Sequence, residues 1–429
     1  MSRVQARRRR ILAVLTAGMA AALLCAGCSS SSSSASTARS SGEVVHIFGW
    51  GDETAPADEG QAPQTYLKDA PEAAVEAINS NPSSKVKLTF TFCDTGSTPN
   101  GTATCAQQAL SPTGCNGSPC TGAVDLGSQN ENVAIPPLRA AGMPVVALDP
   151  DNVQVMDTPG VFCVDGTDQA AAPGLGYLLK VAGAHKVGIV GFQIPEITAI
   201  DQWMTGGIRD QGLTLNGNSN PAETDVNPQP AINAVMGNGA DGFIYGGAYV
   251  GSVLKYVRST YPNAKIAMPS YITAPTLLQG TPVSVTNGIS VSAYQQPVSA
   301  TQVPGVQQYL NETRGKVTPA FQSLSYSLLA WLSIHFIDNV ASGISGSAST
   351  TSLLQAIKHA ENVNMYGIMP PWSASQLGKD GAAACSPYHV FVAESLKNNL
   401  QVTDEPGVFR DSATGKVAYV DPGFKAPQG

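Results

Sequence analysis

Three consecutive polar residues, Ser128, Gln129 and Asn130, follow a short apolar segment and precede a stretch with helical spacing. Hydroxyl and amide groups beside the free N–H groups at the start of a helix can hold a carboxylate or carbonyl oxygen. The same residue types also serve as helix N-caps without touching a ligand. The first interpretation predicts ligand contacts, foremost by Ser128, and the second predicts only a stable helix start.

Other aromatic and polar residues follow further segments that have the composition of buried strands. Tryptophan and tyrosine combine a flat apolar surface with one polar group, which suits contact with a small solute. Each of them could instead pack against its own loop, and an aspartate before proline also favours a turn. The candidate ligand-binding residues of this kind are Trp50, Asp149, Phe192, Tyr249, Ser270 and Tyr271.

Motifs for catalysis and for cofactors do not account for this pattern. Residues 237–242 have the spacing GxGxxG, but they precede a predicted strand, so they are predicted to be a helix-to-strand loop. The Gly-Lys pairs lack the Ser or Thr of a phosphate-binding loop, and no HExxH or GxSxG motif occurs. None of the six cysteines that follow Cys28 is spaced as a CxxC pair. The sequence therefore predicts a protein with no cofactor and no metal, and an enzyme is the weaker class.

The N-terminal segment has the organisation of a secretory signal. Arg3 and the arginines at 7–10 precede an apolar stretch at 11–24, and the small residues Ala26 and Gly27 precede Cys28. This arrangement resembles the lipobox of bacterial lipoproteins, in which the cysteine is acylated, for example with palmitate, and becomes the first mature residue. Cys25 stands where leucine is usual. An uncleaved anchor is the alternative, but the apolar stretch is shorter than the roughly 20 residues that span a bilayer.

Six cysteines remain after such processing, and an even number in an exported chain predicts disulfides. The competing interpretation is a zinc site, which the five scattered histidines do not support. Local spacing favours two short bridges and leaves one long-range pair. The predicted disulfides are Cys93–Cys105, Cys115–Cys120 and Cys163–Cys385.

Charge and composition narrow the class of partner. The formal net charge of −7 becomes −12 when the five signal arginines are removed. An acidic chain lacks the electrostatic attraction for nucleic acid, so we expect none as a partner. With 43% hydrophobic and 13% charged residues the chain has the composition of a globular protein rather than a disordered one. Residues 29–41, mostly serine, are predicted to be a flexible spacer.

The elements that must position the candidate residues alternate between strand and helix. Short apolar stretches at regular intervals are separated by segments with helical periodicity, which predicts parallel sheets covered by helices. Two such series predict two α/β lobes. Predicted strands lie at 44–48, 86–92, 123–126, 144–148, 186–190, 242–245, 265–268 and 388–392; predicted helices lie at 73–79, 102–110, 132–141, 170–182, 199–211, 231–236, 251–259, 321–339 and 351–360.

Four segments in this order resemble the type I periplasmic binding proteins of the branched-chain amino-acid group. They are EAAVEAINSN (72–81), FCDTGSTPNGTATCAQQA (92–109), GMPVVAL (142–148) and GFIYGGAYVGSVLKYVRS (242–259). The resemblance implies an α/β fold of two Rossmann-like lobes joined by a multi-strand hinge, with the ligand in the cleft between them. It also implies a ligand-binding serine at the position of Ser128.

The domain boundaries expected on this basis divide the chain into four parts. Residues 1–27 are the signal peptide and 28–42 the lipidated linker. Residues 43–155 with about 298–372 form the first lobe, and 156–297 with about 373–429 form the second.

The resemblance implies an extracytoplasmic lipoprotein that captures a small solute and passes it to the permease of an ABC importer. Its membrane attachment is the lipid, and a monomer is expected. A ligand-sensing receptor of the same fold, or an extracytoplasmic enzyme, is the alternative. The family acid that pairs with an amino acid's ammonium would fall near Ser270, where no acid is present. A buried unpaired ammonium is costly, so we expect a neutral or carboxylate-bearing solute.

Overall fold

The computed structural model describes residues 43–54, 63–150, 152–191, 197–222, 227–247 and 249–424. All of them belong to one compact unit, Arg39–Gly429. The signal segment, Cys28 and the serine-rich spacer lie outside the described residues, and so does Phe192. Within the described part of the chain, every helix falls short of the length and apolarity that a membrane crossing requires.

The first of two β-sheets has five parallel strands in the order β2-β1-β3-β4-β5. Its strands are short and apolar, and those at its centre are buried on both faces, as parallel sheets require. The strands are β1 (Val44–Gly51), β2 (Lys87–Asp94), β3 (Gly122–Asp125), β4 (Val145–Ala147) and β5 (Val161–Cys163).

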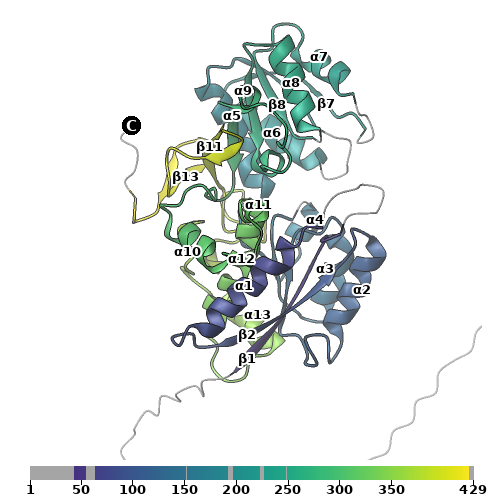
Figure 1. Cartoon of the computed structure of the whole chain (residues 1–429), viewed down its shortest axis with the longest axis vertical. Coiled ribbons are helices and arrows are strands. Elements are labelled where there is room, and N and C mark those ends of the chain that lie inside the picture. Colours follow the sequence, from purple (N-terminus) through teal and green to yellow (C-terminus); the bar gives the residue numbers. More distant parts are fainter. Residues whose placement is uncertain are drawn as a thin grey trace, which may run out of the picture. The chain divides into compact units, whose positions relative to one another are not determined.

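Helices cover both faces of this sheet (Figure 1). One core joins side chains of α1, α12 and α13 to alternate residues of β1, and another joins α2 and α3 to the residues between them. The helices of this region are α1 (Tyr66–Ser80), α2 (Pro99–Leu110), α3 (Glu131–Ala140), α4 (Val153–Met156), α10 (Pro304–Glu312), α11 (Pro319–Gln322), α12 (Ser325–Ala341) and α13 (Thr350–Lys358), with the 3₁₀ turn η2 (Ala374–Gln376).

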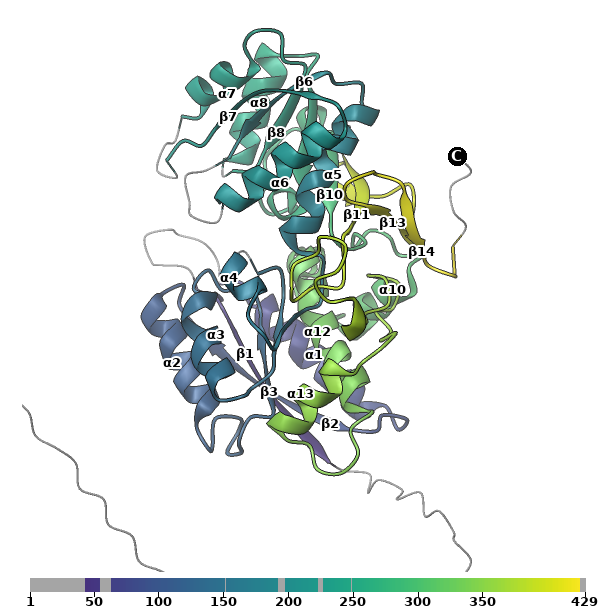
Figure 2. The same cartoon turned by 180° about the vertical axis from the view of Figure 1, so that it is seen from behind.

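The second sheet is mixed, in contrast to the parallel sheet that the sequence predicts. Strands β7, β6, β8, β9 and β10 are parallel, whereas β11, β13 and β14 continue the sheet in antiparallel pairs and β12 pairs with β11 (Figure 2). The strands are β6 (Lys186–Val190), β7 (Thr214–Ser219), β8 (Gly242–Tyr245), β9 (Lys265–Pro269), β10 (Ser290–Ala293), β11 (Val390–Lys397), β12 (Leu400–Val402), β13 (Val408–Asp411) and β14 (Val417–Val420).

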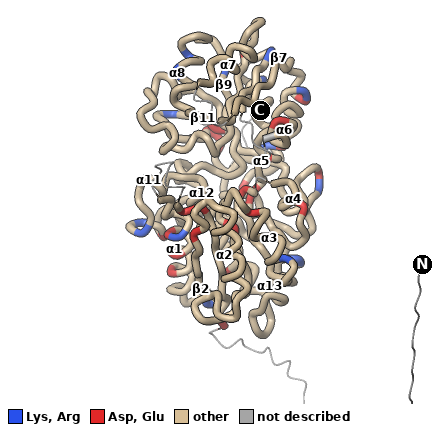
Figure 3. Tube along the Cα trace, turned by 90° about the vertical axis from the view of Figure 1, so that its right-hand side faces the viewer, with Lys and Arg blue, Asp and Glu red and all other residues tan. Residues whose placement is uncertain are grey.

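The helices of the second sheet also divide between its faces. Side chains of α5 and α6 form one core with β6, and those of α7 and α8 form another with β8 and β9. These elements are α5 (Thr167–Val181), α6 (Ile197–Asp210), α7 (Gln229–Met236), α8 (Val250–Thr260), α9 (Val283–Thr286) and the 3₁₀ turn η1 (Ser270–Thr273). Charged residues of both signs are sparse along the whole trace (Figure 3).

The chain passes between the two sheets three times: from β5 into α5, from β10 into α10, and from η2 into β11. The disulfide Cys163–Cys385 joins the first of these segments to the third, and the Cys163 N–H donates to the Cys385 carbonyl at 2.9 Å. The other two predicted disulfides are also present. Cys93–Cys105 links β2 to α2, and Cys115–Cys120 closes the following loop. The lobe boundaries given above stay a prediction.

One acid is buried within the second sheet without a visible function. Glu394 of β11 lies opposite Val291 of β10, is 5% exposed, and neither of its carboxylate oxygens has a hydrogen-bond partner. Burial raises the pKa of Glu394 well above its ordinary value of 4.5. The carboxyl group is therefore costly to the fold in either protonation state, and more so when ionised.

We expect Glu394→Leu to raise the free energy of unfolding at neutral pH by about 1–3 kcal/mol. Above pH ~4.5 the unfolded chain loses this proton before the folded chain does, so the stability of the wild type falls as pH rises toward the raised pKa. Urea unfolding at pH 5 and pH 8 should therefore show a larger gain at pH 8. A stability gain that is equal or smaller at pH 8 than at pH 5 contradicts this account. Glu72→Leu, on the exposed face of α1, is the control and should show no such gain.

Candidate functional site

Polar side chains from both sheets gather where the parallel strands end. Asp52 follows β1, Ser128 follows β3 and Asp149 follows β4, while Ser270 follows β9 and Tyr294 follows β10. The carboxyl ends of parallel strands are the usual binding edge of an open α/β sheet, because the loops there are free to vary without disturbing the core. Two adjoining cavities open at this edge.

The smaller cavity has a volume of about 190 Å³ and belongs mainly to the first sheet. Three of the residues that line it are acids, Asp52, Glu131 and Asp149, and all three are buried. The other described residues that line it are Gln64, Tyr66, Leu67, Leu126, Gly127, Ser128, Gln129 and Tyr326.

Asp52 occupies the position at the start of α3 that could otherwise receive an anion. Its Oδ2 accepts the Gln129 N–H at 2.9 Å, and its Oδ1 accepts the Ser128 hydroxyl at 3.2 Å and a short hydrogen bond from Thr95. The carboxylate of Asp52 is therefore held by three donors. The Ser128 hydroxyl, which the sequence predicts to hold a ligand oxygen, lines the cavity but donates its hydrogen to Asp52.

Asp125, the last residue of β3, holds the next two donors. The N–H groups of Gly127 and Ser128 both donate to its Oδ1, at 3.3 and 3.2 Å. Gly127 has φ +86°, a conformation that glycine adopts readily and that turns both N–H groups back toward Asp125. Burial raises the pKa of Asp125 to about 8, with Asp52 adding repulsion, although these hydrogen bonds oppose the shift.

Every backbone N–H from residue 126 to residue 131 has an acceptor within the chain. Beyond those already described, Leu126 donates to the Trp50 carbonyl, Asn130 to the Ser128 hydroxyl and Glu131 to the Ser128 carbonyl. This accounting leaves none of these six groups for a ligand.

Asp149 stands at the junction of the two sheets. Its Oδ2 accepts the Tyr326 hydroxyl at 2.8 Å and a short hydrogen bond from Tyr294, whereas its Oδ1 has no hydrogen-bond partner. The side chain is 5% exposed, and burial raises its pKa although both tyrosine hydroxyls and the backbone N–H of Asp168 oppose the shift. Its φ of +40° is rare for a residue with a Cβ, and such strained backbone is concentrated at functional sites.

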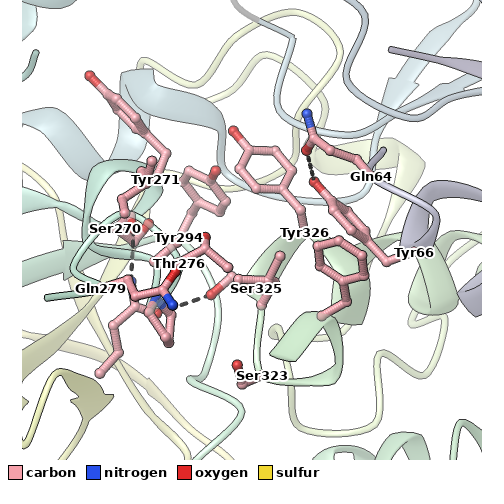
Figure 4. Close-up of a pocket in the computed structure, with 16 residues that line it drawn as sticks. Gln64, Tyr66, Ser270, Tyr271, Thr276, Gln279, Tyr294, Ser323, Ser325 and Tyr326 are labelled. Atoms are coloured by element: carbon pink, nitrogen blue, oxygen red, sulfur yellow. Dashed lines mark hydrogen bonds between the residues drawn. The ribbon is translucent and has the colours of Figure 1, made fainter. Parts of the chain in front are cut away.

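The larger cavity has a volume of about 630 Å³, and its walls are mostly aromatic and aliphatic (Figure 4). The rings of Tyr66 and Phe321 lie 5.4 Å apart between their centroids, and the Tyr66 hydroxyl donates to Gln64 Oε1 at 2.8 Å. Tyr66, Gln64 and Tyr326 line both cavities, so the two form adjoining parts of one site. Its other lining residues include Tyr271, Leu277, Tyr294, Leu324 and Ser325.

Ser270 and Gln401 are two of the polar residues that line the larger cavity. The Ser270 carbonyl accepts from Gln401 Nε2 at 2.7 Å and from the Thr273 hydroxyl at 2.9 Å. These bonds hold η1 against β12, while the buried Ser270 hydroxyl has no hydrogen-bond partner. Its Oγ is thus a polar group that a solute could satisfy.

The structure brings five of the predicted residues to these cavities: Ser128, Gln129, Asp149, Ser270 and Tyr271. Trp50 is 1% exposed and packs with Phe48 under α2 and α3, because alternation along β1 turns it away from the cavities. Asn130 is the N-cap of α3 and lines neither cavity. Tyr249, 48% exposed at the start of α8, also lines neither, and Phe192 lies outside the described residues.

The residues that sequence reasoning missed are Asp52, Tyr66, Tyr294, Phe321 and Tyr326. Asp52 could have been found, since it is the first residue beyond β1, directly after Gly51. The others come from helix starts and from the segment after β10, whose approach to the strand ends is a result of tertiary packing. Among the described residues that line the two cavities none is Lys, Arg or His.

A metal or a covalent nucleophile is not indicated by this geometry. Within the described ranges no group of three or more His, Cys, Asp or Glu residues is placed to hold a metal ion. The arrangement offers hydrogen-bond acceptors at one end and an aromatic enclosure at the other, which suits reversible binding.

Comparison with protein families gives one match over most of the chain. Residues 60–399 match the family model described as periplasmic binding protein. A search of curated proteins finds no match.

Solved structures resemble the chain in fold at low sequence identity. A solute-binding protein of an ABC transporter from Rhodopseudomonas palustris HaA2, in complex with p-hydroxybenzoic acid, has a TM-score of 0.68 at 12% identity, covering 90% of this chain and 100% of that one. A branched-chain amino-acid ABC transporter protein from Thermus thermophilus with bound valine has a TM-score of 0.64 at 15% identity, and the match covers 84% of this chain and 95% of that one. The isoleucine complex of a substrate-binding protein from Streptococcus pneumoniae has a TM-score of 0.63 at 14% identity, and the match covers 83% of this chain and 97% of that one.

Proposed function

Because the chain belongs to the periplasmic binding protein family, we propose that it captures a small solute in the two adjoining cavities and delivers it to the permease of an ABC importer. The observation that carries this proposal is the position of the cavities. They lie at the strand ends of both sheets and share Gln64, Tyr66 and Tyr326 as walls. A solute bound there would contact both sheets at once, so its binding would favour a closed arrangement that a permease can recognise.

The solute leaves the site unchanged in this proposal. The site contains aromatic surface, hydroxyls and hydrogen-bonded acids, and these support binding and orientation without a nucleophile activated by an adjacent base. Loss of the gene should abolish saturable uptake of the bound solute by cells. Normal uptake together with loss of a transcriptional or chemotactic response would instead favour the receptor function. Turnover of the solute by the purified protein would favour an enzyme.

We further propose that the mature chain is anchored outside the cytoplasm by a lipid on Cys28, with a spacer before the first strand. Intact-mass analysis of membrane-extracted protein should show an N-terminal diacylated or triacylated cysteine. Cys28→Ala should release the protein from the membrane fraction, while Cys25→Ala should leave acylation in place. Recovery of a full-length unacylated chain would contradict the anchor.

A further inference from the structure

The start of α3 cannot receive a carboxylate as it stands. Helix N-termini bind anions through their free N–H groups and the partial positive charge of the helix dipole. Here the six consecutive N–H groups of residues 126–131 already have acceptors, and Asp52 and Asp125 supply three of those bonds. The protein's own carboxylates therefore occupy the place where an anionic ligand group would bind.

The charge around the smaller cavity also opposes an anion. Asp52, Glu131 and Asp149 line it, and no described residue that lines either cavity carries a positive charge. A carboxylate brought into this partly buried space would meet like charges with weak screening by water. Neither repulsion nor desolvation would be offset by a basic partner.

Two further observations favour a positively charged group. Asp149 is nine-tenths buried, lines the smaller cavity, and has one carboxylate oxygen with no partner. Tyr66 and Tyr326 line both cavities, and Phe321 packs on Tyr66. Aromatic faces attract organic cations through the negative charge of the ring face, and an acid beside them adds a counter-charge.

Resting on the proposed function, we infer that the solute is a small organic cation, with an ammonium group beside Asp149 and an apolar body in the larger cavity. This replaces the neutral or carboxylate-bearing solute expected from Ser270, because the acids lie on the first sheet and not after β9. It also separates this chain from the structural neighbours, since p-hydroxybenzoate, isoleucine and valine all carry a carboxylate.

Matched probes that differ only in the head group test this inference. Calorimetric titration of the mature protein with tyramine, tyrosol and 4-hydroxyphenylacetate compares an ammonium, a hydroxyl and a carboxylate on one aromatic body. Isoamylamine, isoamyl alcohol and isovalerate repeat the comparison on an aliphatic body. We expect the amine to bind at least tenfold more tightly than its acid in at least one set. Equal or tighter binding of the acids, or no binding by either amine, overturns the inference.

A gain of affinity in a variant gives a test that misfolding cannot mimic. Asp52→Ala frees the Gln129 N–H and the Ser128 hydroxyl, so the amine-to-acid affinity ratio should fall at least tenfold and the acid should bind more tightly than to wild type. Asp52→Ser serves as a second variant if Asp52→Ala does not fold. Asp157→Asn removes the same charge at an exposed position that lines neither cavity, and it should leave the ratio unchanged. An unchanged ratio in folded Asp52 variants contradicts the inference.

Failure of this inference is distinguishable from failure of the proposed function. Carboxylate or neutral solutes that bind and compete with one another at the cavities would overturn the cation assignment and leave solute capture intact. Consumption of a bound solute would overturn solute capture whatever the head group.

Discussion

Removal of the Cys163–Cys385 disulfide should destabilise the protein more than removal of either of the other two disulfides. The bridge spans 222 residues and joins two of the three segments that pass between the sheets. Loop closure of this length restricts the unfolded chain strongly, which predicts a loss of about 5 kcal/mol in the free energy of unfolding for the double Cys→Ala variant. The surrounding bonds, such as Trp372 Nε1 to the Cys163 carbonyl at 3.0 Å, are expected to keep the native fold.

The Cys115–Cys120 bridge is the matched control, because it closes a loop of only five residues. Its removal should cost about 2 kcal/mol by the same relation. Denaturant unfolding of both double variants under oxidising conditions compares the two losses directly. Equal losses would show that strain or local packing, and not loop closure, determines the effect. A larger loss from the short bridge would contradict the account.

Tyr326→Ala should weaken solute binding more than any other single change in the aromatic walls. Tyr326 lines both cavities and donates to Asp149 at 2.8 Å, so its loss removes a shared wall and one of the two hydroxyls that hold the acid. Truncation of a central aromatic contact typically costs 2 kcal/mol or more, which predicts a Kd increase of roughly thirtyfold or greater. Titration calorimetry with the tightest-binding probe measures it.

Two other tyrosine variants separate the contributions. Tyr326→Phe keeps the ring and loses the hydroxyl, so its Kd should rise by less than that of Tyr326→Ala. Tyr256→Ala on α8 removes an equal ring from a residue that lines neither cavity, and it should bind like wild type. A Kd that is unchanged in Tyr326→Ala would mean that the solute binds elsewhere.

The fold was predictable where local patterns and tertiary structure agree. Residues 186–190 and 242–245 are short apolar stretches bounded by turns, and they form β6 and β8 with the predicted bounds. Strand β7 was missed because Thr214–Ser219 is a polar strand without an apolar run. It lies at the edge of the sheet and pairs only with β6. The antiparallel strands after β11 escaped prediction too. Strands β12 and β13 pair with β11, whose own place in the sheet is set by its pairing with the distant strand β10.

The site was predictable only in part, and register explains most of the rest. Strand ends pointed to Ser128, Asp149 and Ser270, and all three line the cavities. Alternation along β1 instead turns Trp50 into a core and leaves Asp52 at the cavity. Tyr66 was missed because the predicted helix begins only at residue 73, whereas α1 begins at Tyr66 and contains Pro71. The predicted helix 321–339 divides into α11 and α12, which places Tyr326 in the first turn of α12, beside Asp149.

The inferred preference for a cation requires no change in the topology of either sheet. Asp52, after β1, accepts the Gln129 N–H and the Ser128 hydroxyl, and Asp125, the last residue of β3, accepts the N–H groups of Gly127 and Ser128. Neither side chain interrupts a strand or a helix.

The most direct test of the central claim is calorimetry on the mature protein with the compounds that a thermal-shift screen of small amines, amides, carboxylates, aromatics and amino acids identifies. The account predicts one solute bound per chain, loss of that binding in Tyr326→Ala but not in Tyr256→Ala, and complete recovery of the unchanged solute after prolonged incubation. Absence of binding across the screen, binding that is indifferent to Tyr326, or conversion of the solute into a product would contradict it.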